Sequence, residues 1–263
     1  ILFFFLFFLI AILPISDADS IALHQNLANT IYQNGLGNIN FNQNIAFTIF
    51  SNTHTLLIIS PILNSDNFGS QFNLATLIFF IFTNIKNHKN FSIILFSCPL
   101  IIYFISVQKL QLFFGLLYLM IFVLINKKLI RKKLEIFIII LLLGFYASGN
   151  LSYILFAAPL YIYFFYTYKR DWKNIIFYSL ITFIITLFPL FTIKEIYFHN
   201  FLAPVLDNIF GTNNFLYNAY SYSLRVTEGW LSDISNFEKY LRPFIPLSIS
   251  NLSSSLGIIF LLM

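Results

Sequence analysis

Two aspartates and a histidine follow directly on an unbroken apolar run at the start of the chain. After thirteen apolar residues, the segment "SDADSIALH" (16–24) supplies Asp17, Asp19 and His24. No Lys or Arg precedes Lys86, so no cation nearby in the sequence neutralises these carboxylates. A pair of carboxylates at a water boundary can act as a general base, or can hold a divalent cation over a phosphate.

The same segment also has the pattern of a helix start. Ser16 suits the N-cap and Asp19 the third helical position, as in a capping box, and acids in a first turn suit the helix dipole. Ser20 and His24 are four residues apart and Asp17 lies one turn earlier, so we expect the three on one helix face. A cap accounts for one acid, but not for a second acid and a histidine on that face. Both interpretations stay open.

Two further polar groups lie in predicted connections between apolar runs. The segment "ISVQKLQL" (105–112) contains Lys109 and Gln111. Lys109 is either an interfacial lysine whose stem lies along apolar surface or a contact to a lipid-linked phosphate, with Gln111 beside it. The segment 194–243 mixes aromatic and charged side chains, which suits a sugar-binding face or an interfacial belt. Its candidate binding residues are His199, Tyr222, Arg225 and Glu228.

The composition indicates what kind of protein positions these groups. Of 263 residues, 59% are hydrophobic and 10% are charged, whereas a soluble domain has about 25% charged residues. Such a chain cannot cover a soluble surface with polar groups, so we predict a protein embedded in the lipid bilayer. The single Cys98 excludes an internal disulfide and suits a buried position. The net charge of +5 comes from clusters between apolar runs, so we expect no nucleic-acid partner.

We predict an all-α polytopic membrane protein with about eight transmembrane helices, because backbone polar groups in lipid must be paired within helices. The first helix is short and the last still apolar at its end, so we expect one transmembrane domain over 1–263, truncated inside both helices of a longer protein. A cleaved signal peptide is the alternative for the first run, although a basic start and a small-residue cleavage site are missing. The predicted helices are 1–14, 68–85, 91–107, 110–126, 134–148, 151–168, 174–193 and 244–263.

Lys and Arg cluster in three short connections, which the positive-inside rule places in the cytoplasm. These connections are 86–90, 127–133 and 169–173. Two large loops, 15–67 and 194–243, then face outward and are expected to hold short interfacial helices. This topology depends on residues 45–63, which are long enough to span but carry "SNTHT" at their centre. Polar groups are costly at mid-bilayer, so we predict that this run lies at the interface or re-enters; if it spans, Asp17 is cytoplasmic.

Taken together, the acids just past the first helix, the short middle connections and the second long outer loop resemble the GT-C superfamily of polytopic glycosyltransferases. That superfamily includes protein mannosyltransferase-like and aminoarabinose transferase-like enzymes. In detail, the chain is most similar to an uncharacterised bacterial group with segments like "DADSIALH", "DNFGSQFN" (66–73) and "SCPLIIYFISVQKLQL" (97–112). The resemblance implies an enzyme of the bacterial inner membrane with its active face outward. It moves a sugar from a polyprenyl-phosphate carrier to a glycan, lipid or protein acceptor, with inversion at the anomeric carbon.

The resemblance places the catalytic acid of the first loop on Asp17 or Asp19, with His24 beside them. In this chemistry the acid deprotonates the acceptor hydroxyl, and cations steady the departing phosphate. We expect Lys109 and Arg225 to take that second role. Substrate contacts are then expected from Gln111, His199, Tyr222 and Glu228.

Many GT-C enzymes carry a second acid in a middle outer loop, where this chain has Lys109. A divalent cation on Asp17 and Asp19 therefore stays an open alternative, and we expect no firm cofactor.

A flippase for lipid-linked oligosaccharides, or another polytopic transporter, is the alternative function. A transporter needs polar residues at mid-membrane along a path. The predicted helices 110–126, 134–148 and 174–193 are almost purely apolar, which favours the transferase.

Overall fold

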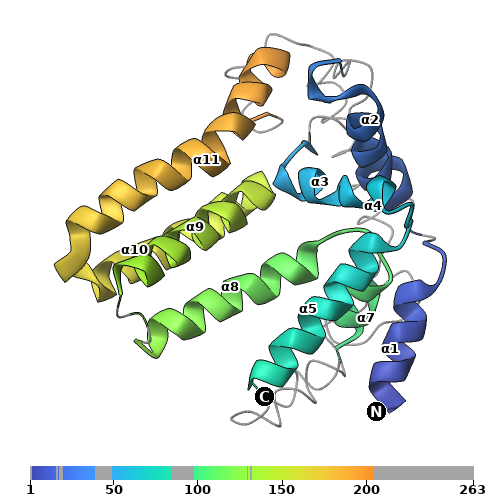
Figure 1. Cartoon of the computed structure of the whole chain (residues 1–263), viewed down its shortest axis with the longest axis horizontal. Coiled ribbons are helices and arrows are strands. Elements are labelled where there is room, and N and C mark those ends of the chain that lie inside the picture. Colours follow the sequence, from blue (N-terminus) through green and yellow to red (C-terminus); the bar gives the residue numbers. More distant parts are fainter. Residues whose placement is uncertain are drawn as a thin grey trace, which may run out of the picture. The chain divides into compact units, whose positions relative to one another are not determined.

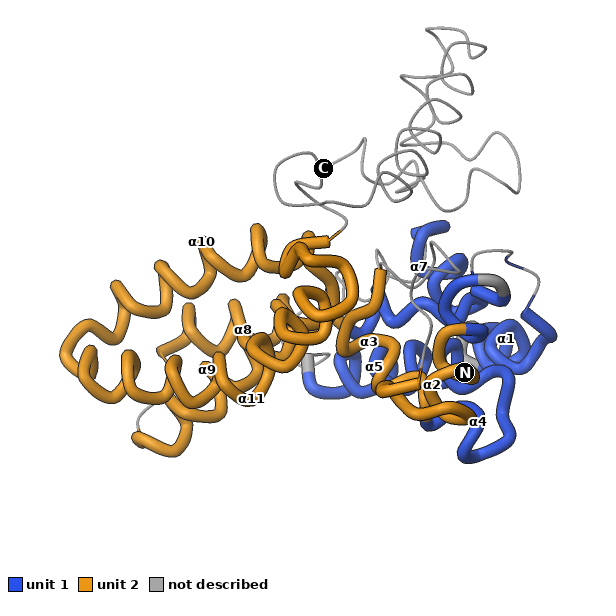
Figure 2. Tube along the Cα trace, turned by 90° about the horizontal axis from the view of Figure 1, so that it is seen from above, with its two compact units in different colours: residues 1–26, 59–113, 219–263 blue, residues 27–58, 114–218 orange. Residues whose placement is uncertain are grey.

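The structure is a computed structural model, which describes residues 2–15, 17, 20–38, 49–84, 98–128, 130 and 132–203. All regular elements in this part of the chain are helices, which confirms the predicted all-α class. The predictions for Asp19, Tyr222, Arg225, Glu228 and the helix at 244–263 lie outside the described residues. The described chain divides into two compact units, coloured in Figure 2. Unit 1 contains residues 2–26 and 59–113, and unit 2 contains residues 27–58 and 114–203.

Unit 1 is built on three apolar helices, α1 (Leu2–Ile12), α5 (Phe68–Asn84) and α7 (Pro99–Ile105), which pack against one another (Figure 1). The last carbonyls of α1 have no partner within the helix, and side chains from the start of α5 satisfy them. Asn67 donates to the Ile12 carbonyl at 2.8 Å, and Ser70 donates to the Ala11 carbonyl at 2.9 Å. The chain that leaves α1 toward Asp17 is thereby held against α5.

A buried asparagine on α5 fixes the connection from α7 to α8 (Gln111–Asn126). Asn73 donates to the carbonyls of Phe104 at 2.8 Å and Lys109 at 2.7 Å, and accepts from the Phe113 N–H at 3.2 Å. Asn73 is fully buried, and a buried amide that makes all these bonds is far less costly than an unpaired one. The backbone of Lys109 therefore has a defined position.

Unit 2 contains most of α8 together with α9 (Lys133–Gly149), α10 (Leu151–Thr167) and α11 (Trp172–Phe198), and α9 packs against both α10 and α11. A Cβ on Gly144 would collide with Thr182 on α11, so glycine permits the close approach of these two helices. The unit also holds α2 (Asn26–Asn34, from residue 27), α3 (Asn52–Leu57) and two short 3₁₀ turns, Leu36–Asn38 and Lys169–Asp171.

The polar "SNTHT" stretch lies in a broken helical segment. Residues 49–63, the described part of this apolar run, contain α3 with six residues and α4 (Ile59–Ile62) with four. A six-residue helix is about 9 Å long, and the hydrocarbon core is about 30 Å thick, so neither helix is long enough to cross it. Thr53 donates to the Gly149 carbonyl at 2.5 Å and Asn52 to the Ser148 hydroxyl at 2.7 Å. These side chains pair with the polar end of α9.

The other predicted helices agree with the observed ones to different degrees. The helix predicted over 174–193 is too short, because α11 continues to Phe198, so the first residues of the predicted loop 194–243 are helical. The helix predicted over 1–14 is observed over Leu2–Ile12, and residues 91–97 of the one predicted over 91–107 lie outside the described residues. Helices predicted over 68–85, 110–126, 134–148 and 151–168 begin and end within one residue of α5, α8, α9 and α10. By length and composition, one described helical stretch, residues 169–198, could cross a bilayer, while α5, α8 and α10 are shorter apolar helices. The number of membrane crossings stays a prediction.

Candidate functional site

Asp17 caps the first turn after the α1 segment. Its Oδ2 accepts from the Ser20 N–H at 2.9 Å and from the Ser20 hydroxyl at 2.7 Å. A carboxylate that accepts from the N–H three residues on makes an N-cap bond. The turn that it caps is a π-helix, η1 (Ser20–Gln25). The predicted helix start is therefore present and Asp17 caps it; Ser16 and Asp19 lie outside the described residues.

The same carboxylate also pairs with Lys109. The Lys109 Nζ lies 3.3 Å from Asp17 Oδ2 and donates to the Tyr103 hydroxyl at 3.2 Å. The Tyr103 hydroxyl in turn donates to Asp17 Oδ1 at 3.3 Å. A tyrosine hydroxyl can donate one bond and accept another, so the three groups form a consistent triangle. We call Asp17, Ser20, Tyr103 and Lys109 the Asp17 cluster.

The charges in this cluster are those of an ion pair. Partial burial on its own raises the pKa of Asp17, but the hydrogen bonds from Ser20 and the positive charge of Lys109 outweigh it, so the pKa lies below its ordinary value of 3.8. Asp17 is therefore ionised at neutral pH. The Lys109 side chain is 11% exposed and that of Asp17 is 22% exposed, so the pair meets solvent on one side.

A set of buried hydrogen bonds supports the cluster from behind. The Ser20 hydroxyl accepts from the Gln108 N–H at 3.1 Å, and both residues are almost completely buried. The Gln108 side chain accepts from the Gly69 N–H and donates to the Asp66 carbonyl. A Cβ on Gly69 would collide with Gln108, so this approach requires glycine. The segments 66–73 and 105–112 therefore contact each other and jointly position the Asp17 cluster.

No family model, curated protein or solved structure matches this chain. The chemistry of the Asp17 cluster is therefore the basis for assigning a function.

The structure brings Asp17 and Lys109 together, and the other predicted site residues that it describes are His24, Gln111 and His199. His24 is half-buried within η1, and Gln111 is exposed at the first residue of α8. His199 is exposed in unit 2, where it ends α11 in the left-handed conformation with a φ of 51°. The substrate contacts expected from Gln111 and His199 stay predictions.

Tyr103, Gln108 and Asn73 were not among the site residues predicted from the sequence. Tyr103 lies within the apolar segment "PLIIYFI" of α7. In such a segment, the sequence pattern favours a side chain that faces lipid. The available signal was its place just before a short polar stretch that contains Ser106, Gln108 and Lys109.

The donor set of the cluster suits an ammonium better than a divalent metal. Asp17 Oδ2 already contacts Ser20 and Lys109, and Oδ1 contacts Tyr103. A divalent cation at Asp17 would have to displace the Lys109 ammonium, because two cations cannot share one carboxylate at this distance without strong repulsion. Among the described residues, no three His, Cys, Asp or Glu side chains are grouped to hold a metal ion.

Proposed function

We propose that this chain is a glycosyltransferase of the bacterial inner membrane, which transfers a sugar from a polyprenyl-phosphate carrier to an acceptor hydroxyl on the outer face. The observation that carries the proposal is the Asp17–Lys109 pair, in which a carboxylate and an ammonium lie 3.3 Å apart beside solvent. A base for the acceptor and a cation for the leaving phosphate must reach one bound substrate. In this pair the carboxylate that would act as the base lies next to the ammonium that would contact the phosphate.

The proposed step moves one proton and exchanges one bond. Asp17 takes the proton of the acceptor hydroxyl as the acceptor oxygen bonds to the anomeric carbon. The bond from that carbon to the phosphate oxygen breaks, and polyprenyl phosphate leaves with the electron pair. The Lys109 ammonium stabilises the negative charge that develops on the phosphate.

Donor binding is expected to strengthen the base. Without substrate, the positive charge of Lys109 helps to hold the pKa of Asp17 below its ordinary value. A donor phosphate that draws the ammonium toward its own oxygens weakens that stabilisation of the carboxylate, so the pKa of Asp17 rises. The carboxylate then becomes a better base only when the donor is in place.

The outward orientation is supported by the lengths of two helices that lie between α1 and α5 in the sequence. Neither α3 nor α4 is long enough to cross a bilayer, which suits a first loop that stays on one side of the membrane from α1 to α5. The basic connections 127–133 and 169–173 suit the opposite, cytoplasmic side.

The proposal is tested with the full chain in proteoliposomes and a panel of polyprenyl-phosphate sugars labelled in the sugar. The measurement is the formation of free polyprenyl phosphate together with movement of label to an added acceptor. A transferase cleaves the bond to the phosphate, whereas a flippase moves the labelled lipid across the bilayer intact. Asp66→Asn is the matched control, because Asp66 is an exposed carboxylate of the same unit that accepts from Gln25 at 2.6 Å. Transport of intact donors without cleavage, across the whole panel, would overturn the proposal.

A further inference from the structure

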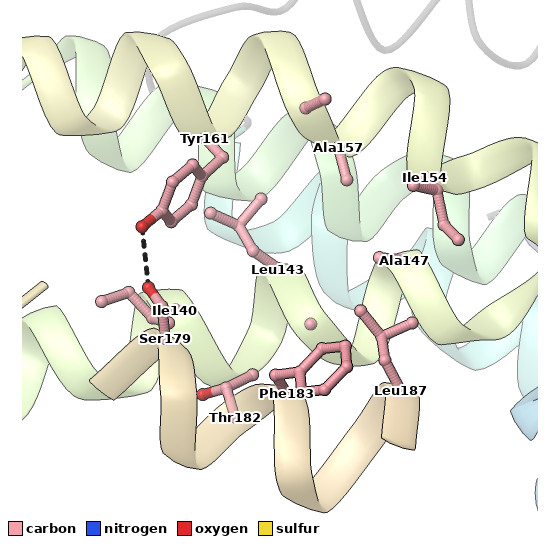
Figure 3. A pocket seen from close by; sticks show the side chains of 12 residues that line it. Ile140, Leu143, Ala147, Ile154, Ala157, Tyr161, Ser179, Thr182, Phe183 and Leu187 are labelled. Carbon is pink, nitrogen blue, oxygen red and sulfur yellow. Dashed lines mark hydrogen bonds between the residues drawn. The ribbon is translucent and has the colours of Figure 1, made fainter. Parts of the chain in front are cut away.

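Unit 2 contains an apolar groove of about 380 Å³ between α9, α10 and α11 (Figure 3). Small side chains on facing helices, including Ala147 and Ala157, leave this space, and Phe183 lies at its exposed edge. A hydrogen bond of 2.8 Å joins Tyr161 and Ser179 on opposite sides of one end (Figure 3). The rest of the lining is almost entirely hydrocarbon, so the groove suits an aliphatic chain and not a polar ligand.

One end of the same helices carries a dense group of exposed cations, which we call the basic rim. It consists of Lys127, Lys128, Lys132 and Lys133 between α8 and α9, and Lys169, Arg170 and Lys173 between α10 and α11. These are seven of the nine Lys and Arg in the described residues; the other two are Lys109 and Lys194. The two turns lie side by side, since the Tyr163 hydroxyl donates to Asn126 at 3.2 Å and the Tyr163 and Phe122 rings are 6.1 Å apart. Against seven cations, these turns carry the acids Glu135 and Asp171.

Aromatic side chains are interleaved with the basic rim. The Lys169 Nζ lies 5.6 Å from the ring of Tyr166, and the Lys173 Nζ lies 5.7 Å from that of Trp172. Both rings are exposed, at 72% and 48%. Exposed Trp and Tyr beside lysines are typical of the headgroup level of a bilayer, where the ring and the lysine stem contact apolar chains and the charge meets phosphate.

The spacing between rim and groove matches a phospholipid. Ile140 lines the groove seven residues after Lys133 on α9, and Ser179 lines it seven residues after Trp172 on α11. Seven helical residues correspond to about 10 Å. The headgroup region of a bilayer leaflet is about 5–8 Å deep, so a lipid with its phosphate at the rim starts its acyl chains close to the groove.

We propose that unit 2 binds one anionic phospholipid, with the phosphate on the basic rim and an acyl chain in the groove. The charge of the rim selects an anionic headgroup, and the apolar lining accepts the chain. The inference requires that the chain is a membrane protein, as in the proposed function, but it does not require sugar transfer.

The test is native mass spectrometry of the full chain in detergent, with phosphatidylglycerol or phosphatidylcholine of identical acyl chains. Each basic residue near an anionic surface is worth about 1 kcal/mol, or about fivefold in affinity, so we expect the wild type to prefer phosphatidylglycerol by about tenfold or more. Combined Lys132→Gln, Lys133→Gln, Lys169→Gln and Lys173→Gln should remove the preference. The same four positions changed to Arg should keep it, because the charge is retained.

The groove is tested separately. Ala158→Phe places a ring at the groove and should weaken both lipids several-fold, whereas Leu155→Phe, at a 75% exposed position of the same helix, should have no effect. Two results would overturn the proposal: equal binding of the two lipids, or insensitivity of phosphatidylglycerol binding to Ala158→Phe. In the Ala158→Phe variant, millimolar inorganic phosphate can be added to compete with phosphatidylglycerol. If phosphate displaces the lipid there, only the headgroup is bound, and the proposed binding of an acyl chain in the groove is wrong.

These results are independent of the transferase assay. A chain that prefers phosphatidylglycerol but cleaves no donor refutes the proposed function and leaves this inference intact. A chain that transfers sugar but shows no lipid preference refutes this inference and leaves the proposed function intact.

Discussion

Each of the two units buries a polar cluster at the end of apolar helices, and the two clusters differ in charge. The Asp17 cluster of unit 1 contains an ion pair with one side open to solvent. The corresponding group in unit 2, the Asn52 cluster, consists of Asn52, Thr53 and Ser148, and it is neutral. Its side chains donate to Ser148, to the Gly149 carbonyl and to the Thr186 carbonyl of α11.

The difference separates a structural role from a chemical one. Neutral groups that satisfy backbone carbonyls stabilise the packing and leave little capacity for a ligand. A partly buried ion pair is a weak source of stability, because desolvation offsets much of the attraction between its charges. Under the proposed function the pair acts on the substrate and adds little to the stability of the fold.

The largest expected effect is on turnover in Asp17→Asn. Asparagine still caps the turn about as well as aspartate but cannot accept the acceptor proton, so we expect transfer to fall by about 10²–10⁴-fold. The variant also leaves Lys109 without its carboxylate, which should lower the free energy of unfolding by about 1–3 kcal/mol. Turnover per folded molecule and chemical denaturation measure the two effects, and Asp66→Asn should change neither.

Lys109→Gln is expected to lower turnover by about 10²–10³-fold, the usual value for one electrostatic contact to a developing charge. Lys109→Arg should retain part of the activity, because it keeps the charge although its geometry differs. The two Lys109 variants are compared by the rate at which they release polyprenyl phosphate in a single turnover. Equal loss in Arg and Gln variants would show that shape, and not charge, matters at this position.

In unit 2, Thr53→Val should affect stability and not chemistry. The change leaves the Gly149 carbonyl without its 2.5 Å hydrogen bond in a buried place, at a cost of about 1–3 kcal/mol. Thr192→Val is the matched control, because the Thr192 hydroxyl donates to the Phe188 carbonyl of its own helix at 2.8 Å. Unchanged turnover per folded molecule is expected for both; a hundredfold loss in Thr53→Val would break the contrast between the two clusters.

The smallest effect is the pH dependence of the ion pair. Because the pKa of Asp17 is lowered in the folded protein, its contribution to stability is present above the ordinary value of 3.8 and is lost as pH falls through the folded value. The difference in unfolding midpoint between wild type and Asp17→Asn should therefore be constant from pH 5 to about 8 and shrink below pH 4. A difference that disappears already near pH 6 would assign the titration to another group.

Much of the fold could be predicted from the sequence, because apolar runs separated by basic or Asn-rich stretches set the helix bounds. The predictions for α5, α8, α9 and α10 are within one residue. The π-helical turn after Asp17 could not be predicted, since periodicity does not separate it from an α-helix over six residues.

The candidate site was predicted only in part. Asp17 was identified because no nearby cation in the sequence compensates the acids, and Lys109 because it departs from the positive-inside pattern. Their contact, however, depends on Asn73, which lies 36 residues before Lys109 in the sequence. Tyr103 was missed because an isolated tyrosine in an apolar helix carries no spacing signal. Long-range hydrogen bonds of this kind are a property of packing and leave no local pattern.

The most direct test of the central claim is the turnover of the double variant Asp17→Asn with Lys109→Gln. It replaces the ion pair by a neutral pair of similar shape, so no unpaired charge is left to destabilise unit 1. We expect an unfolding midpoint close to that of the wild type and a release of polyprenyl phosphate per folded molecule that is at least about 10²-fold slower. A folded double variant that releases polyprenyl phosphate at the wild-type rate would contradict the account and leave the Asp17 cluster with the structural role of a helix cap.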